Sequence, residues 1–328
     1  MAQSSVPAII AATYAVPDRI VENSDPIFDY IRNHQLAGQN LFQGYHERRY
    51  LEPGQPVTDL MVQASRQAIA RAGLTARAVD RLYGYASVSL ASTPNDLGLL
   101  HQELGMSSTS RVIAINTEFT NFPDAVEAAH DAIRAGRCAN ALICLGSNWT
   151  RFVDYRTPAA LSAGDGAGAV ILGPRADKSQ FELVDTEALL DGQYFGTMVM
   201  QPELLPNEGE KYSHPYFQIL PNGAQGFTDF AIPSVPKVVG ALLQRHKLTG
   251  SDVTLATHQA SAVMLDQWQE AIKPRFFAST FDNFANTTLA ALPITLAFHY
   301  DHIPTDWVVL CGVGHYFHTT AILLRRGT

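Results

Sequence analysis

The chain has 328 residues, 46% of them apolar and 16% charged, and its 23 basic and 31 acidic side chains give a net charge of −8. This composition supplies a large core and excludes intrinsic disorder as the main state. The acidic balance argues against nucleic acid or an anionic membrane surface as a partner, and no apolar stretch approaches the ~18 residues that a membrane span needs.

The first half of the sequence alternates expected strands with expected helices. In chain order we predict a strand at 6–14, a helix at 57–72, a strand at 82–88, a helix at 94–104, a strand at 112–115, a helix at 122–135 and strands at 141–145 and 167–172. The strand at 112–115 is expected to be buried. The glycines at 164–168 lead into a strand instead of a helix, so they indicate a tight turn and not a dinucleotide-binding loop.

The second half repeats this layout. We predict a helix at 230–246, a strand at 253–257, helices at 260–271 and 286–300, and strands at 307–311 and 319–324. Alternating strands and helices favour an α/β fold with a largely buried sheet. The similar layout of the two halves indicates an internal duplication.

Cysteine and histidine spacing indicates neither disulfides nor a metal. The three cysteines form no CxxC motif, and their odd number predicts a reduced, cytoplasmic compartment. The pairs Glu127/His130 and His299/His302 are fragments of metal motifs without a matching second pair. We therefore expect no metal and no other cofactor.

Two polar residues stand where an α/β fold assembles its site. His258 directly follows the strand at 253–257, and Asn286 begins the next expected helix. Side chains at these two places could donate hydrogen bonds to one thioester oxygen and stabilise an enolate as charge develops on it. The alternative for each residue is a helix cap or a hydrogen-bonded polar group of the core.

Several segments, taken in order, resemble β-ketoacyl-ACP synthase III, a condensing enzyme of the thiolase superfamily. They are 116–135, 164–172, the Thr-His-Gln-Ala of 257–260, the Ala-Asn-Thr of 285–287 and the Gly-Val-Gly of 312–314. The Gly-Tyr-His-Glu-Arg-Arg at 44–49 is similar to the family's Thr-Gly-Ile-x-Glu-Arg-Arg stretch. The resemblance covers nearly the whole chain. It implies the family's five-layered αβαβα duplication, with halves at 1–174 and 175–328.

The resemblance implies a cysteine nucleophile at a helix start, with a histidine and an asparagine around the thioester. His258 and Asn286 match the last two. Where the family reads Ala-Ala-Cys-x-Gly-Phe, this sequence reads Thr-Glu-Phe-Thr-Asn-Phe at 117–122, which puts Phe119 at the nucleophile position and Glu118 just before it. A phenylalanine cannot form a thioester, so we expect the ordinary acyl-enzyme route to be closed.

Other expected substrate contacts also follow from the resemblance. Phe42 stands where the family has an arginine that contacts CoA, and Ser261 replaces the asparagine of its His-Gln-Ala-Asn motif. Val263 occupies a basic carrier-docking position. Phe42, Ser261, Gly312 and Gly314 are expected to lie in the substrate-binding region.

Two functions fit these residues. The first is an acyltransferase that acts on acyl-CoA or acyl-ACP thioesters by condensation, decarboxylation or acyl transfer, without a cysteine nucleophile, in polyketide or fatty-acid-type secondary metabolism. Glu118 would then act as base or nucleophile, because burial in an apolar tunnel raises the pKa of a carboxyl. The alternative to this catalytic role is that the Glu118 carboxylate is salt-bridged or faces solvent. The second function is a non-catalytic partner subunit of a heterodimeric condensing enzyme.

The resemblance also implies an assembly. We expect a homodimer, or a heterodimer with a cysteine-bearing ketosynthase, and an acyl carrier protein as a further candidate partner. The apolar strand at 141–145 is expected to pair across the two-fold axis.

Overall fold

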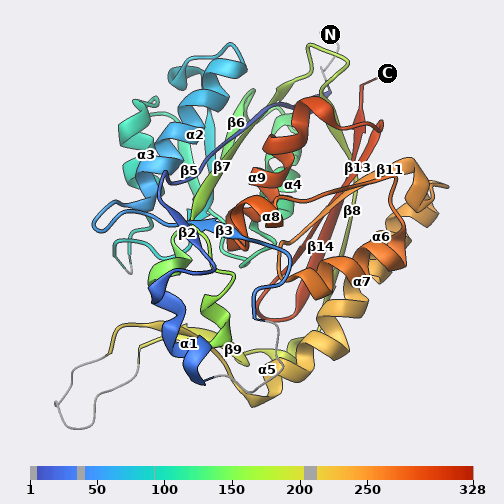
Figure 1. Cartoon of the computed structure of the whole chain (residues 1–328). Coiled ribbons are helices and arrows are strands. Elements are labelled where there is room, and N and C mark those ends of the chain that lie inside the picture. The colour runs from blue at the N-terminus through green and yellow to red at the C-terminus, as the bar shows by residue number, and fades with distance from the viewer. Residues whose placement is uncertain (1–5, 35–40, 92, 203–212, 328) are drawn as a thin grey trace.

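The computed structural model describes residues 6–34, 41–91, 93–202 and 213–327. Its main strands fall into two sets (Figure 1). The first set comprises β1 (Pro7–Ala15), β4 (Arg81–Ala86), β5 (Arg111–Ala114), β6 (Ala141–Ser147) and β7 (Gly166–Pro174). The second set comprises β8 (Phe181–Leu190), β11 (Val253–Thr257), β12 (Phe276–Ala278), β13 (Trp307–Val313) and β14 (His318–Arg326).

α-Helices and two small sheets accompany these strands. The helices are α1 (Asp29–His34), α2 (Val57–Arg71), α3 (Leu97–Leu104), α4 (Asn121–Arg134), α5 (Pro221–Gly226), α6 (Ile232–Arg245), α7 (Ala262–Ile272), α8 (Phe281–Phe284) and α9 (Ala291–His299). The small sheets pair β2 (Ile20–Glu22) with β3 (Glu47–Arg49) and β9 (Met198–Gln201) with β10 (Tyr216–Ile219).

The two strand sets have one topology. The strand order is β12-β11-β13-β14-β8-β1-β7-β6-β4-β5. Read outward from the centre, where β8 and β1 are neighbours, each set has its first, fifth, fourth, second and third strands in that order. In both sets the fifth strand is antiparallel to its two neighbours and the other pairs are parallel. The sets meet where β1 pairs with β8 at two positions, Ala8 with Glu182 and Ile9 with Phe181. This repeat confirms the duplicated α/β fold, while the boundary at residue 174 stays a prediction.

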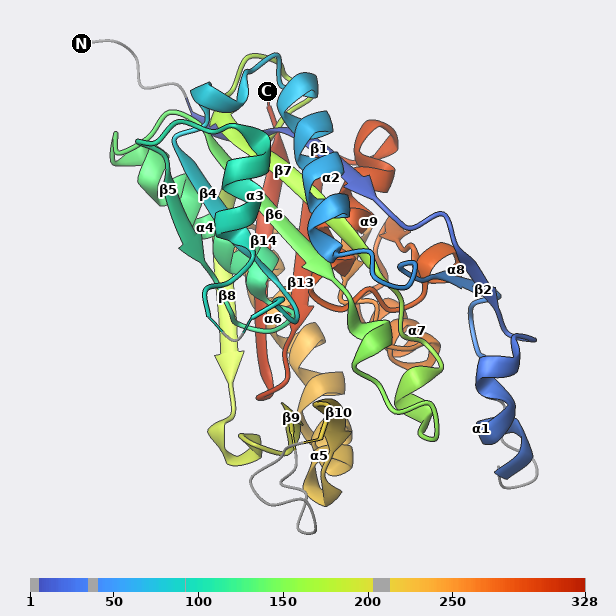
Figure 2. The ribbon, with the colours of Figure 1, turned by 90° about the vertical axis from the view of Figure 1, so that its left-hand side faces the viewer.

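Helices arrange these strands into five layers. α4 and α9 lie between the two strand sets and contact both of them, whereas α2 and α3 cover the outer face of the first set (Figure 2). α6 packs on β8 and β14 from the other side, with α7 beside it. The apolar faces of the two central helices are therefore buried against sheets on both sides.

The glycine cluster at 164–168 is not the turn that the sequence indicates. Gly166 and Gly168 lie inside β7. A Cβ atom built on Gly168 would come within 2.7 Å of the Cβ atom of Pro293 in α9, and one on Gly166 within 2.9 Å of Ile294 Cδ1. The glycines thus allow a central helix to approach the strand closely.

Two expectations for strands in the first set are wrong. The strand at 112–115, expected to be buried, is β5 at the end of the sheet, where Val112 is 41% exposed. The strand at 141–145, expected to pair across a two-fold axis, is β6, which pairs with β7 on one side and β4 on the other. Both edges of β6 are therefore occupied within the chain.

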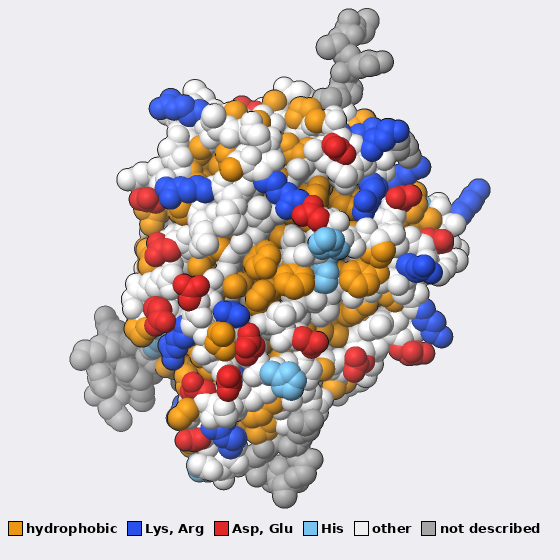
Figure 3. All heavy atoms as spheres, turned by 45° about the horizontal axis from the view of Figure 1, so that its top comes forward, with side chains coloured by type: hydrophobic (Ala, Val, Ile, Leu, Met, Phe, Trp, Pro, Cys, Tyr) orange, Lys and Arg blue, Asp and Glu red, His pale blue; other side chains and the backbone are white. Residues whose placement is uncertain are grey.

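Charged side chains of both signs are interspersed over the face seen in Figure 3. Within the described residues, no helix has the length and apolar character needed to cross a bilayer.

Candidate functional site

A strained turn precedes the central helix α4. Glu118 and Phe119 have φ angles of 30° and 72°, in the left-handed region that large side chains rarely adopt. Asn121 holds the turn from both sides. Its Oδ1 accepts a hydrogen bond from the Phe119 amide at 2.7 Å, and its Nδ2 donates to the Ile115 carbonyl at 2.7 Å. Strain that is held in this way is typical of functional sites.

A buried network supports the next residue of the turn. The Thr120 hydroxyl donates to the Asp124 carboxylate at 2.8 Å and accepts from Nε2 of His318 at 2.7 Å. The Thr117 hydroxyl donates to the same carboxylate oxygen. Burial lowers the pKa of His318 to about 4, so its ring is neutral near pH 7. The turn is therefore tied to β14, a strand of the other set.

Two glycines let the turn press against the end of β13. A Cβ atom on Gly312 would lie 2.4 Å from the Phe119 carbonyl oxygen, and one on Gly314 would lie 2.3 Å from the Glu118 carbonyl oxygen. The same Cβ atom on Gly314 would lie 1.8 Å from Cε1 of His318. Only glycine fits these two positions without moving the turn.

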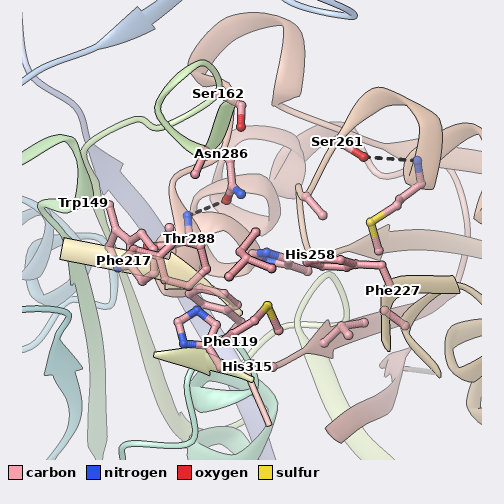
Figure 4. A pocket seen from close by; sticks show the side chains of 18 of the residues that line it. Phe119, Trp149, Ser162, Phe217, Phe227, His258, Ser261, Asn286, Thr288 and His315 are labelled. Atoms are coloured by element: carbon pink, nitrogen blue, oxygen red, sulfur yellow. Dashed lines mark hydrogen bonds between the residues drawn. The ribbon is translucent and has the colours of Figure 1, made fainter. Parts of the chain in front are cut away.

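A cavity of about 410 Å³ opens beside the turn (Figure 4). Most of its lining is apolar, which is typical of a binding site for a small organic molecule. The side chains with polar atoms that line it are His258, Asn286, His315, Ser162, Ser261, Thr288 and Trp149.

The Phe119 ring lies between two histidines in the lining. It stacks on His258 with 4.6 Å between ring centroids and 9° between ring planes. It meets His315 edge to face at 4.3 Å, and Trp149 lies 5.6 Å away. The residue at the expected nucleophile position therefore places an inert aromatic surface beside His258.

The structure brings His258 and Asn286 to one cavity. The His258 amide donates to the Cys311 carbonyl at 2.9 Å, which fixes the residue at the end of β11. Asn286 Oδ1 accepts from the Thr288 amide at 2.9 Å, so the Nδ2 group is the part of this side chain left to bind a ligand. Asn286 lies before a single 3-10 turn at Thr288–Ala290 and not in a helix, because α9 begins only at Ala291.

The His258 ring is neutral near pH 7. Burial alone lowers its pKa to about 3. Its Nδ1 is buried without a hydrogen-bond partner in the structure. A neutral imidazole can donate one N–H to a carbonyl oxygen, and this ability does not change across the physiological pH range.

The other expected contacts divide between the cavity and its surroundings. Ser261 and Gly314 line the cavity, and the Ser261 hydroxyl also accepts from the Met264 amide at the start of α7. Gly312 packs under the turn and is not a lining residue. Phe42 lies outside the lining and packs edge to face on Phe28.

Glu118 lies outside the cavity lining although it precedes Phe119. Its carboxyl is near the hydroxyls of Tyr85 and Tyr316, whose pKa values it helps to raise. Its Oε2 atom is buried without a hydrogen-bond partner in the structure. Burial raises the pKa of the carboxyl from 4.5 to about 7.

We expect Glu118→Gln to stabilise the protein increasingly as pH rises above about 4.5. The folded protein keeps the Glu118 proton up to about pH 7, whereas the unfolded chain loses it near pH 4.5. The wild-type free energy of unfolding therefore falls as pH rises between these values, and the variant lacks this fall. The variant should match wild type near pH 4.5 and exceed it by about 1–3 kcal/mol at pH 8. Urea unfolding at both pH values measures the difference, and equal stabilities at pH 8 would contradict it.

Sequence reasoning missed three aromatic lining residues, His315, Trp149 and Phe217. His315 stacks on Phe217 at 5.1 Å, and Trp149 meets Phe217 at 4.7 Å. Burial, with His258 and His318 nearby, lowers the pKa of His315 to about 3. The one local signal was the position of His315 directly after the Gly-Val-Gly segment.

The cysteines offer no substitute nucleophile in the cavity lining. Cys144 and Cys311 are fully buried; burial raises the pKa of the Cys144 thiol to about 12 and raises that of Cys311 as well. The Cys311 carbonyl contacts His258, but its side chain belongs to an apolar cluster that includes Val239 of α6. Over the described part of the chain, no group of three histidine, cysteine or acidic side chains is placed to hold a metal ion.

The chain has recognisable relatives. The family model for 3-oxoacyl-ACP synthase III matches residues 114–192. The β-ketoacyl-ACP synthase III of a Synechocystis strain is 29% identical over 335 aligned positions, covering 97% of both chains. The enzyme of the same name from Aliarcobacter butzleri is 26% identical over 301 positions, covering 87% of this chain and 86% of that protein.

Solved structures share the fold. The 3-oxoacyl-ACP synthase III of Pseudomonas aeruginosa superposes with a TM-score of 0.83 at 22% identity, covering 98% of this chain and 99% of that one. The priming β-ketosynthase of the R1128 polyketide pathway gives 0.85 at 19% identity, covering 100% and 98%. The chain is thus similar to β-ketoacyl-ACP synthase III over nearly its whole length, and it has the thiolase-like fold of these condensing enzymes.

Proposed function

We propose that this chain processes an acyl thioester in the described cavity without forming an acyl-enzyme at residue 119. The observation that carries the proposal is the Phe119 ring stacked on His258 beside the cavity. The backbone supports it, because the Phe119 amide donates to Asn121 and the Gly314 amide donates to the His318 carbonyl at 2.8 Å. Both amides already donate hydrogen bonds within the protein, so neither is available to stabilise an oxyanion at this turn.

The remaining polar groups suit stabilisation of charge on the thioester oxygen. In the proposal, neutral His258 and the Nδ2 group of Asn286 donate to that oxygen while an enolate or tetrahedral oxyanion develops. This role serves condensation, decarboxylation or direct acyl transfer. The similarity to a β-ketoacyl-ACP synthase III and to a priming β-ketosynthase of a polyketide pathway supports a carrier-bound or CoA-bound acyl substrate in a secondary pathway.

Intact-mass spectrometry tests the absence of an acyl-enzyme. After incubation with acyl-CoA or acyl-ACP we expect the protein mass to stay unchanged, because residue 119 has no thiol and two of the three thiols are fully buried. Cys138→Ser, which removes the half-buried thiol, controls for chemical acylation. An adduct on Cys144 or Cys311, or one that persists in the control variant, would refute the proposal.

A non-catalytic partner subunit is the second candidate. The aromatic contact between Phe119 and His258 favours it, because this contact covers a face of the ring that would otherwise be open to a ligand. The catalytic role of Glu118 stays a prediction. Glu118 lies outside the cavity lining whereas His258 lines the cavity, so a catalytic role has less support for Glu118 than for His258.

We also propose that the chain assembles as a homodimer, or as a heterodimer with a related ketosynthase. The β5 strand offers the pairing edge, because it ends the sheet and leaves backbone groups along one side for another strand. Its exposed Val112 adds apolar surface there. A cytoplasmic location remains a prediction from cysteine usage.

A further inference from the structure

A closed circuit of hydrogen bonds surrounds Asn286. The Asn286 carbonyl accepts from the Gly164 amide at 2.9 Å, and the Gly164 carbonyl accepts from the Ser147 hydroxyl at 3.3 Å. Ser147 Oγ then accepts from the Thr288 hydroxyl at 2.8 Å, and the Thr288 amide donates to Asn286 Oδ1 at 2.9 Å. The circuit ties Asn286 to the first strand set, because Ser147 is the last residue of β6.

The circuit fixes which end of the Asn286 carboxamide is free. Its Oδ1 is held by the Thr288 amide, so Nδ2 lies on the other side of the group (Figure 4). A carboxamide turned the other way would place Oδ1 beside the thioester oxygen, which is also an acceptor. The orientation therefore determines whether Asn286 stabilises or repels the charge that develops there.

Two strained residues flank Asn286. Ala285 has φ 54° and ψ −141°, close to a backbone region that is almost restricted to glycine. Thr288 has φ 50°, which is an outlier for a β-branched residue. Both residues are buried. Strain of this kind persists only where the surroundings hold it, and it gathers at functional sites.

A glycine lets the strained segment lie close to the first strand set. A Cβ atom on Gly164 would come within 2.4 Å of the Phe284 carbonyl oxygen. On the other side of Gly164, the Asn286 amide donates to the Ser162 carbonyl at 2.7 Å. The backbone of Asn286 is thus clamped at both its amide and its carbonyl.

We infer that Ser147 and Thr288 are positioning residues that hold the Asn286 carboxamide with its Nδ2 group toward the substrate, and that the strain at Ala285 serves the same purpose. Their hydroxyls act through Asn286 and not on the substrate, because both are committed to the circuit. The inference rests on the proposed function, in which Asn286 donates to the thioester oxygen.

Ser147→Ala opens the circuit at a residue outside the cavity lining. The assay is thiol release from the acyl-CoA that wild type turns over fastest in a series from acetyl-CoA to dodecanoyl-CoA. We expect kcat to fall about tenfold with KM within about twofold of wild type, because Asn286 acts on charge that develops in the transition state. In an Asn286→Ala background the same substitution should lower kcat less than about twofold, since the residue through which Ser147 acts is gone.

Thr288→Val breaks the same hydroxyl contact from the other side. It keeps the side-chain shape and should give the same pattern of kcat and KM, so the inference can be tested even if Ser147→Ala does not fold. Unchanged kcat in both variants, together with a loss in Asn286→Ala, overturns the inference alone. A wild type that releases no thiol from any member of the series, or an unchanged rate in Asn286→Ala, overturns the proposed function as well.

Ser234→Ala is the matched control. Ser234 is buried outside the lining, donates to the Ala231 carbonyl at 3.2 Å and bonds to the Thr319 hydroxyl at 2.7 Å, so it repeats the contacts of Ser147. Its substitution should lower the urea midpoint about as much as Ser147→Ala and leave kcat unchanged. An equal fall of kcat in this control, or an equal fall for Ser147→Ala in both backgrounds, would show a purely structural role.

Ala285→Gly tests the strain, because it removes a Cβ atom and no hydrogen bond. We expect a higher urea midpoint together with a kcat at least about threefold lower, since glycine relaxes the backbone beside Asn286. A lower midpoint would show that Ala285 is not strained. A wild-type kcat would show that its strain does not position Asn286.

Discussion

Replacing His258 by alanine is expected to lower kcat/KM for the acyl thioester about 10²–10³-fold, which corresponds to about 2.7–4 kcal/mol of transition-state stabilisation. Asn286→Ala should cause a loss of the same order, because each variant removes one donor to the thioester oxygen. Steady-state release of the free thiol measures the rates. Circular dichroism should show an intact fold, since both side chains line a cavity and do not fill the core.

Two comparisons make this result decisive. His302→Ala changes an exposed histidine outside the lining and should leave kcat/KM unchanged. Glu118→Gln in the same assay tests the base role, since a loss comparable to that of His258→Ala would assign the chemistry to the carboxylate as well. If His258→Ala is silent, the catalytic proposal fails and the partner-subunit candidate replaces it.

Gly314→Ala should destabilise the protein by about 2–3 kcal/mol and remove activity. The added methyl group would overlap the His318 ring and the Glu118 carbonyl oxygen, so the turn that carries Phe119 must move. Urea unfolding gives the stability change, and thiol release gives the rate.

Gly240→Ala is the matched control for this substitution. Gly240 lies exposed in α6, where an added Cβ atom meets nothing within 4 Å. Alanine there should raise the free energy of unfolding by up to about 1 kcal/mol, because glycine is the poorer helix former. A Gly314→Ala protein as stable and active as this control would show that the turn is not pressed against β13.

The sequence predicts strands well where one type of side chain dominates. The boundaries of β11 match the expected 253–257 because all of its residues are buried. The long strand β8 was not predicted at all, since polar and charged residues interrupt its apolar ones. Its Asp185 and Glu187 bind Arg245 of α6, and this tertiary pairing is not visible in local sequence.

The sequence predicts only part of the site, again because contacts between distant segments are not visible in local sequence. His258 and Asn286 follow recognisable segments, and the structure brings them to one cavity. Trp149 and Phe217 join them only through contacts between distant segments, so no local pattern indicates them. Glu118 was expected beside the substrate because it directly precedes Phe119. In the structure both residues have left-handed backbone angles, and the Glu118 side chain lies outside the cavity lining.

The join between the two strand sets has an evolutionary consequence. Phe119 and Trp149 come from the first copy of the repeat, whereas His258, Asn286 and His315 come from the second. Neither copy contains a whole site, so after duplication each was free to specialise in a different part of it. A substitution at residue 119 in the first copy therefore leaves the polar side chains of the second copy in place, so the chemistry at this position can change while the scaffold stays the same.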